Sequence, residues 1–383
     1  MERSASRTAL TGLAALAVAM GVGRFAFTPI LPMMQADAGV SLAEGGWLAS
    51  ANYAGYLAGA LWAAAVPVRP DRAIRFGLLA IAIATIGMGL DGGFAYWIAL
   101  RAIAGIASAW VLIHISVWCL GRLAAAGRAA LSGTVYAGVG SGVALAGVVC
   151  LVLMQRGASS AQAWILLAAI SLVLTALLWP AVQGDAQAPA AEAQPAARDG
   201  LAWRLIVAYG AYGIGYIIPA TYLPVMAREV VADPALFGWA WPVFGAAAAA
   251  STLAVAQLGR RFGHRRLWLA AQLVLAAGVA APVVFGGVAG ILLAALCVGS
   301  TFVVITMEGM QVARELLGAR GAPLMAAMTA AFAAGQIAGP AAASLLVAAG
   351  GRLEHALIGA CMLLLASVFL LTGRTYTGVP RSL

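Results

Sequence analysis

Long, nearly uninterrupted apolar runs fill most of the 383-residue chain, and short polar segments rich in arginine and glycine separate them. A helix needs about 20 apolar residues to cross the hydrocarbon core of a bilayer, where it satisfies its own backbone hydrogen bonds. The runs are too long for the strands of a membrane barrel. The pattern therefore predicts an all-α integral membrane protein with twelve spans, at 9–34, 44–66, 73–90, 94–119, 130–154, 161–182, 203–226, 236–258, 267–287, 289–313, 322–349 and 355–373.

Composition supports a membrane protein and argues against most soluble classes. Apolar residues make up 63% of the chain and charged residues 9%, whereas soluble domains average about 45–50% and about 25%. The net charge of +9 does not indicate a nucleic-acid partner, because the basic residues sit at the ends of apolar runs and form no single patch.

The sequence gives no sign of a metal site, a cofactor site or an enzyme. The four cysteines stand singly inside apolar stretches, without the spacing of metal ligands or of a disulfide framework. All 22 basic residues are arginine, so the chain lacks the lysine of the ATP-binding phosphate loop. We therefore expect no cofactor and no ATP-driven transport.

The arginines predict which way the spans point, because loops on the cytoplasmic side of a membrane carry an excess of basic residues. With twelve spans, the arginines beside the termini, beside the middle of the chain and in every second loop share one side. The opposite loops hold only Arg156, Arg228 and Arg352. Both termini are therefore predicted to be cytoplasmic.

An internal repeat relates the two halves of the chain at an offset of 192 residues. Leu31-Pro32 aligns with Leu223-Pro224, and Gly46-Trp47 aligns with Gly238-Trp239. Because six spans separate equivalent positions, the halves have the same orientation in the membrane. We expect two pseudo-symmetric six-helix halves, residues 1–182 and 203–383, joined by an Ala/Pro-rich cytoplasmic linker at residues 183–202.

This plan resembles the major facilitator superfamily (MFS) of transporters. The loop after the second span keeps the acidic and basic positions of the superfamily's loop motif but neither of its glycines, and the loop after the eighth span keeps Gly263 but has arginine in place of aspartate. In the superfamily this loop contributes to a cytoplasmic gate that closes by charge pairing. The resemblance assigns five residues to that gate: Asp71, Arg72, Arg75, Arg261 and Arg265.

The first span, from Gly21 to Gln35, resembles that of the YbfB-like bacterial transporters, and the likeness covers nearly the whole chain. It implies a multi-pass protein of the bacterial inner (plasma) membrane, whose halves rock around a substrate site near the midplane. The family supplies a fold and a class of function but no substrate.

Three charged residues lie well inside predicted spans, away from the span ends, where a charge costs about 2.5–3.5 kcal/mol. Arg24 and Arg101 lie at comparable depth in the first and fourth spans, where two guanidinium groups would attract a carboxylate or a phosphate. Arg101 could instead bind backbone carbonyls or extend to the membrane interface. Glu308, in the inner half of the tenth span, is a candidate proton carrier or the partner of Arg314 or its counterparts near the inner surface. His114 could titrate near neutral pH or serve packing alone.

Polar and aromatic stripes on the second and seventh spans complete the predicted site, although such stripes also serve as packing or interface anchors. The predicted substrate-binding residues are Arg24, Arg101, Thr28, Asn52, Tyr56, Tyr212 and Tyr216. The predicted proton-coupling residues are Glu308 and His114.

These features favour a monomeric secondary transporter that moves a small organic anion by alternating access, coupled to protons through Glu308. Its expected partners are the small-molecule substrate, protons and the lipid bilayer. One alternative is an exporter that exchanges cationic or amphipathic drugs or metabolites for protons, with Glu308 attracting the cation. An alternative from another class is a non-transporting membrane sensor, which would need a signalling domain.

Overall fold

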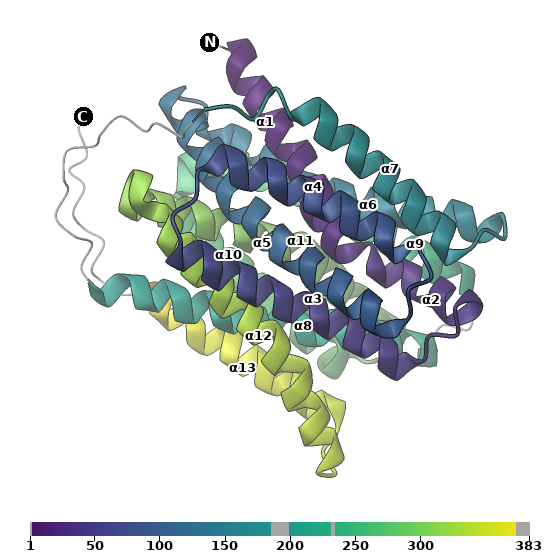
Figure 1. Ribbon diagram of the computed structural model, residues 1–383. Coiled ribbons are helices and arrows are strands. Elements are labelled where there is room, and N and C mark those ends of the chain that lie inside the picture. Colours follow the sequence, from purple (N-terminus) through teal and green to yellow (C-terminus); the bar gives the residue numbers. More distant parts are fainter. Residues whose placement is uncertain (1, 185–198, 231–233, 373–383) are drawn as a thin grey trace.

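The computed structural model describes residues 2–184, 199–230 and 234–372, and all the regular secondary structure in these ranges is helical (Figure 1). The segments are α1 (Glu2–Leu16), the π-helical segment η1 (Ala17–Phe25), α2 (Phe27–Asp37), α3 (Leu42–Ala65), α4 (Pro70–Met88), α5 (Phe94–Ala125), η2 (Ala129–Leu131), α6 (Ser132–Gln155), α7 (Ser160–Leu178), α8 (Asp199–Val230), α9 (Pro234–Phe262), α10 (His264–Phe285), α11 (Gly287–Leu317), η3 (Gly318–Gly321), α12 (Ala322–Ala348) and α13 (Leu353–Thr372).

Every predicted span coincides with a helix in this order. The first span is the continuous run of α1, η1 and α2, and each helix from α3 to α13 is one further span. Gly286 and Gly287, the only punctuation between the ninth and tenth spans, have φ values of +60° and +50°, which end α10 and let α11 begin. Most of the predicted linker, residues 185–198, lies outside the described residues.

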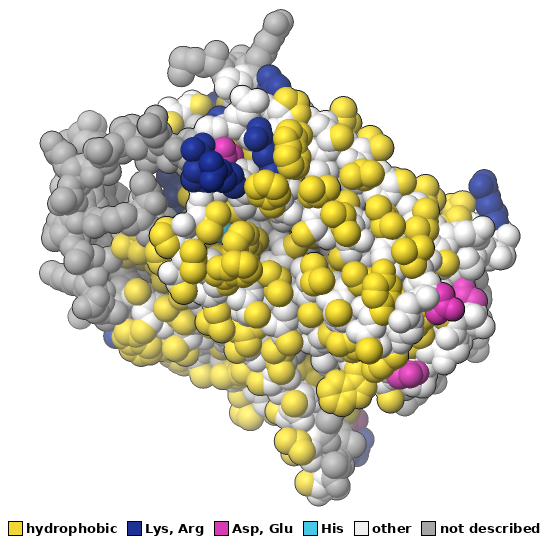
Figure 2. All heavy atoms as spheres, in the orientation of Figure 1, with side chains coloured by type: hydrophobic (Ala, Val, Ile, Leu, Met, Phe, Trp, Pro, Cys, Tyr) yellow, Lys and Arg dark blue, Asp and Glu magenta, His cyan; other side chains and the backbone are white. Residues whose placement is uncertain are grey.

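Nine helices within the described ranges are long and apolar enough to cross a membrane. Helix α4 is not among them, because Asp71, Arg72 and Arg75 lie in its first two turns. Large apolar side chains cover the outer surface, including Phe76, which is 60% exposed, and Leu177, which is 68% exposed. Figure 2 shows a broad hydrophobic surface with arginines gathered towards one end, as expected for contact with lipid.

The two six-helix halves contact one another through two pairs of helices, and the internal repeat relates one pair to the other. Helix α6 packs along α9, and α3 packs along α12. Because the offset of six spans converts α6 into α12 and α3 into α9, these are two copies of one interface. Helices α1 and α7 lie on the opposite side of the bundle from α12 and α13 (Figure 1).

Glycines bring the helix backbones together at the α6–α9 interface. A Cβ atom on Gly140 of α6 would lie 2.4 Å from the backbone nitrogen of Ala249, and one on Gly245 of α9 would lie 2.3 Å from that of Ala144. Small residues at such crossings are how membrane helices gain close packing. The result is a tight interface along which the two halves meet.

The first span is irregular at its centre. Residues Ala17–Phe25 form a π-helix, and regular α-helix resumes at Phe27. A Cβ atom on Gly21 would lie 2.4 Å from the Cα of Gly142 in α6, so the wider π-helical turns fit only against bare backbone. π-helical turns often occur at functional sites, and this one carries Arg24.

Replacing Gly21 with alanine is therefore expected to lower the thermal stability of the detergent-purified protein. Overpacking of this kind costs about 1–3 kcal/mol. Gly46→Ala is the matched control, because Gly46 is an exposed helical glycine and a Cβ atom there would meet no packed neighbour within 4 Å. This control is expected to leave the melting temperature unchanged or slightly raised. Equal melting temperatures for the two variants would contradict the close η1–α6 contact.

Candidate functional site

Arg24 lies between the two halves of the molecule. Its side chain is 3% exposed, and its Nη2 donates a hydrogen bond to Oε1 of Gln336 in α12. The guanidinium carbon stands 4.0 Å from the ring centroid of Tyr56 and 5.3 Å from that of Tyr53, both in α3. The contact places one cation among aromatic rings and joins it to the opposite half.

Several donors of this pair have no acceptor. Nε and Nη1 of Arg24 and Nε2 of Gln336 are buried without a hydrogen-bond partner among the described residues. An unpaired buried donor costs about 1–3 kcal/mol, and more when it is charged. A group that only accepts hydrogen bonds and carries negative charge, such as a carboxylate, would satisfy these atoms. These unpaired donors are therefore suited to an acceptor that carries negative charge.

Three side chains from α3 and α5 hold the π-helical backbone that presents Arg24. Asn52 donates through Nδ2 to the carbonyl of Gly23 at 3.2 Å. Ser108 donates to the carbonyl of Ala19 at 2.8 Å, and Arg101 donates through Nη2 to that of Arg24 at 3.5 Å. Polar side chains of neighbouring helices commonly satisfy backbone groups at irregular turns in membranes.

Arg101 and Asn52 thus contact the protein backbone around Arg24. Arg101 also donates through Nε to the carbonyl of Leu48 at 3.3 Å, and its guanidinium lies 4.6 Å from the Phe27 ring centroid. This is the arrangement that the sequence left open for Arg101 as an alternative to a substrate contact. Thr28 is exposed and lies apart from the buried cluster. Direct substrate contact by these three residues stays a prediction.

Replacing Asn52 with leucine is expected to lower the melting temperature. The side chain is fully buried, and it donates both to Gly23 and, at 3.0 Å, to the carbonyl of Arg101. Loss of two such bonds without loss of volume amounts to about 1–3 kcal/mol. Thr28→Val, a change of similar shape at an exposed position, serves as the control and should leave stability unchanged in a thermal-denaturation assay. Equal effects would argue against a positioning role for Asn52.

Aromatic rings of the second half form a ladder opposite Arg24. Tyr216 stacks on Phe302 at 5.2 Å, Phe302 on Phe244 at 5.1 Å, and Phe244 on Trp241 at 5.4 Å between ring centroids. Phe25, next to Arg24, meets Phe302 edge-on at 6.0 Å. The ladder therefore touches the first half beside the guanidinium.

Two of the predicted tyrosines stand in or beside this ladder. The hydroxyl of Tyr212 donates to the carbonyl of Phe302 at 2.5 Å, which fixes the helix that carries Phe302. Tyr56, Tyr212 and Tyr216 are all at most 2% exposed. Tyr56 thus contacts the Arg24 guanidinium directly, whereas Tyr216 stands in the ladder and Tyr212 lies 6.0 Å from the Tyr216 ring centroid.

A second polar cluster lies at the arginine-rich end of the second half. Glu308 in α11 is fully buried, and its Oε2 lies 2.6 Å from Nδ1 of His264 at the start of α10. Nε2 of His264 lies 3.8 Å from Oε1 of Glu315. The side-chain exposures are 0% for Glu308, 13% for His264 and 52% for Glu315. The three groups thus run from the surface to the interior.

The structure pairs Glu308 with His264, whereas the sequence had suggested Arg314 as its alternative partner. Nε of Arg314 instead donates to Oε1 of Gln311 at 3.2 Å. A cavity of about 430 Å³ opens beside His264 and is lined by Arg265, Arg266 and Glu315 among others. His114 lies elsewhere, with Nδ1 2.8 Å from the Trp110 carbonyl of its own helix. His114 and Glu308 are therefore not brought together.

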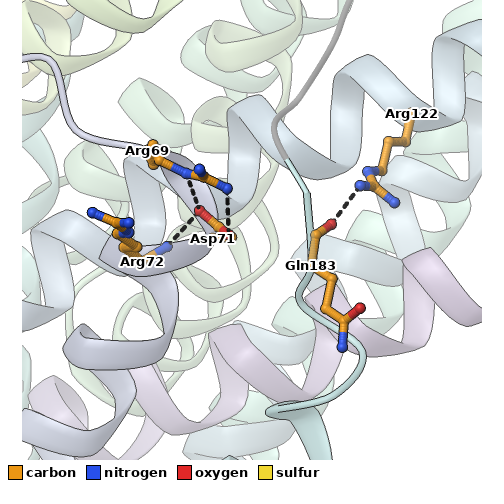
Figure 3. A network of polar contacts seen from close by, with 5 residues as sticks. All are labelled: Arg69, Asp71, Arg72, Arg122 and Gln183. Carbon is orange, nitrogen blue, oxygen red and sulfur yellow. Dashed lines mark hydrogen bonds and ion pairs between the residues drawn. The ribbon is translucent and has the colours of Figure 1, made fainter.

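The predicted gate residues make local contacts. Arg69 holds both carboxylate oxygens of Asp71 at 3.2 Å, and the backbone N–H of Arg72 donates to Oδ1 at 2.9 Å (Figure 3). Asp71 precedes the predicted span 73–90. Its partial burial raises the pKa of the carboxyl, but the hydrogen bonds from Arg69 and Arg72 outweigh this, and the pKa lies below its ordinary value. Asp71 is thus a charged anchor for the start of α4.

The other gate residues rest on aromatic rings or line the cavity. The guanidinium of Arg75 lies 5.4 Å from the ring centroid of Trp179, and that of Arg261 lies 5.4 Å from that of Phe262. Arg265 lines the cavity beside His264. Nearby, Arg122 donates to the carbonyl of Gln183 at 2.7 Å and ties α5 to the segment after α7 (Figure 3). Pairing between these residues as a gate stays a prediction.

Sequence reasoning did not assign Gln336 or His264 to the site. Gln336 stands in the Gly-Gln-Ile-Ala-Gly-Pro stretch of the eleventh span, where a polar residue among glycines was a usable signal. His264 stands in the basic loop after the eighth span, and only the fold shows that it reaches a buried carboxylate.

Comparisons with known proteins agree with this architecture. The crystal structure of the human organic anion transporter MFSD10 (TETRAN) matches with a TM-score of 0.74 at 15% sequence identity, over 97% of this chain and 99% of that one. At this identity the match establishes the fold alone. Comparison with curated protein sequences gave no match.

A protein-family model described as "uncharacterised MFS-type transporter YbfB" matches residues 16–371. The match covers all twelve helical spans in whole or in large part. The chain therefore belongs to this YbfB family of MFS-type transporters.

Proposed function

We propose that this transporter carries a small organic anion, which binds to Arg24 between the two halves. The observation that carries the proposal is the set of buried donors without acceptors on Arg24 and Gln336. Because the two residues come from different halves, one carboxylate could accept hydrogen bonds from both. MFSD10, which shares the fold, is described as an organic anion transporter, and this agrees with the proposal.

Alternating access would follow from the same arrangement. A carboxylate held by both residues would draw the halves together around it, and movement of the halves along the α3–α12 and α6–α9 interfaces would expose the site to one side at a time. The Arg24–Gln336 contact is the one that such movement would make and break. The ligand would thus favour the conformation in which the halves meet at Arg24.

We further propose that transport is coupled to protons through Glu308 and His264. The supporting observation is the decreasing exposure from Glu315 through His264 to Glu308, together with the cavity beside the imidazole. A proton taken up at Nε2 of His264 from the cavity would allow the Nδ1 proton to pass to Oε2 of Glu308. Arg314 and Glu315 lie beside the imidazole, Arg265 and Arg266 line the same cavity, and these charged groups would modulate its proton affinity.

The location we propose is the bacterial inner membrane, with both termini in the cytoplasm. The support is the distribution of arginines, since the end of the molecule that carries Asp71, Arg122 and His264 holds most of them. In this orientation the proton route through His264 would open to the cytoplasm.

A thermal-shift screen of the detergent-purified protein against carboxylates, sugars and lipophilic cations tests the substrate class. We expect stabilisation by carboxylates in the wild type and none in Arg24→Gln. Stabilisation by lipophilic cations that is lost in Glu308→Gln but kept in Arg24→Gln would overturn the proposal in favour of a cation exporter. Stabilisation by sugars alone would overturn it as well.

A further inference from the structure

We infer that the anion is a monocarboxylate whose body is an aromatic ring, an inference that rests on the proposed anion transport. Two independent features of the residues around Arg24 point to this class. The first is the charge available to a ligand, and the second is the set of ring faces around it.

The site offers a ligand free N–H donors from one guanidinium group. Arg24 has unpartnered N–H groups, whereas Arg101 donates to the backbone carbonyls of Leu48 and Arg24 and lies against the Phe27 ring. A second carboxylate would enter a buried region without free donors of its own, and burial of a charge without hydrogen-bond partners is strongly unfavourable. Dicarboxylates and doubly charged phosphates should therefore bind poorly.

The polar donors match a single carboxylate. Two unpartnered nitrogens belong to Arg24 and one to Gln336, and the two side chains are already in hydrogen-bond contact. A carboxylate has two oxygens with about four lone-pair sites and no donor. It can accept from the guanidinium and from the amide together, which a neutral hydroxyl or amide ligand cannot do with the same gain from charge.

The surroundings of this polar pair are aromatic on both sides. Phe25, Tyr53 and Tyr56 approach the guanidinium from the first half at 5.7, 5.3 and 4.0 Å. The second half contributes the ladder Tyr216–Phe302–Phe244–Trp241. Phe25 meets the Phe302 ring edge-on, and its ring centroid lies 6.5 Å from that of Trp241.

Four of these rings retain exposed surface although they lie within the bundle. Phe25, Tyr53, Trp241 and Phe244 are half-buried, whereas Tyr56 and Phe302 are buried. The half-buried rings lie beside Arg24 or at the Trp241 end of the ladder. A ligand ring that extends from a carboxylate on Arg24 would stack on or meet these faces edge-on, which aromatic pairs favour over contact with a saturated ring.

The test measures equilibrium binding of four carboxylates to the purified wild-type protein: benzoate, cyclohexanecarboxylate, phthalate and acetate. Benzoate is expected to bind about 2- to 10-fold more tightly than cyclohexanecarboxylate, which has the same charge and a similar size, through the aromatic contacts. It should bind at least about tenfold more tightly than phthalate, which carries a second charge. Acetate should bind most weakly.

A variant tests whether Phe25 causes the preference for an aromatic ligand. Phe25→Leu is expected to reduce the ratio of benzoate to cyclohexanecarboxylate affinity towards one, with the affinity for cyclohexanecarboxylate kept. The comparison of ligands on the wild-type chain stands even if this variant does not fold. Equal affinity for benzoate and cyclohexanecarboxylate, or phthalate binding as tight as that of benzoate, would overturn the inference and leave anion transport standing. Failure of all four carboxylates to bind would overturn the proposed function itself.

Discussion

Arg24→Gln is expected to weaken the binding of organic anions by about 10- to 100-fold. A hydrogen bond to a charged group contributes about 1.5–3 kcal/mol, and about 1.4 kcal/mol corresponds to a factor of ten in affinity. Arg24 supplies two of the three unpartnered donors of the site and its charge. Glutamine keeps an N–H donor but has no charge, so the affinity that is lost is the part contributed by electrostatic attraction.

Two controls separate this effect from misfolding. Arg72→Gln changes an exposed arginine at the start of α4 and should leave anion binding unchanged. The melting temperature of Arg24→Gln without ligand should not fall, because the change removes a buried cation whose donors are partly unsatisfied. Isothermal titration with a carboxylate measures the affinity, and an unchanged dissociation constant in Arg24→Gln would remove Arg24 from the site.

Glu308→Gln is expected to abolish the acceleration of uptake by a proton gradient while exchange of anion for anion continues. The amide has nearly the shape of the carboxyl group but cannot bind or release a proton. Exchange needs only movement of the loaded transporter, whereas accumulation needs the coupled proton. Uptake into proteoliposomes with and without an imposed pH gradient distinguishes the two.

Glu315→Gln provides the matched control for this prediction. Glu315 is 52% exposed and lies 3.8 Å from His264, in contrast to the 2.6 Å contact of the buried Glu308. We expect it to retain most of the gradient-driven uptake. Undiminished stimulation by the gradient in Glu308→Gln would show that protons, if coupled, use another residue.

The number and order of the spans could be predicted from sequence because the bilayer imposes them. A spanning helix must be apolar for about 20 residues, so Gly286 and Gly287 sufficed to divide two spans that run almost together. The repeat was equally readable, since Pro and Trp rarely match by chance at one offset. These features can be read from the identity and spacing of residues along the chain, without knowing which helices pack together.

The different contacts of Arg24 and Arg101 could not be predicted from the sequence. Both are arginines at comparable depth, and only packing decides where each guanidinium points. Arg101 reaches carbonyls exposed by the π-helical turns, whereas Arg24 reaches Gln336, 312 positions away in the chain. Neither the π-helix nor the register between α12 and the first span leaves a local signal, because both arise from contacts between distant helices.

The partner of Glu308 could not be predicted from the sequence either. Its burial followed from its position in the tenth span, but its partner depended on how the start of α10 packs against α11. The sequence offered Arg314, six residues further along the same helix, while the fold brings in His264. The change of partner converts a structural ion pair into a pair of titratable groups beside a cavity.

The central claim, that the protein moves an organic anion bound at Arg24, is tested most directly by flux of radiolabelled carboxylates into proteoliposomes. We predict flux above that of protein-free liposomes for the wild type, saturation with carboxylate concentration, and loss of both in Arg24→Gln reconstituted in equal amount. Wild-type flux no greater than in protein-free liposomes, or undiminished flux in Arg24→Gln, would contradict the account.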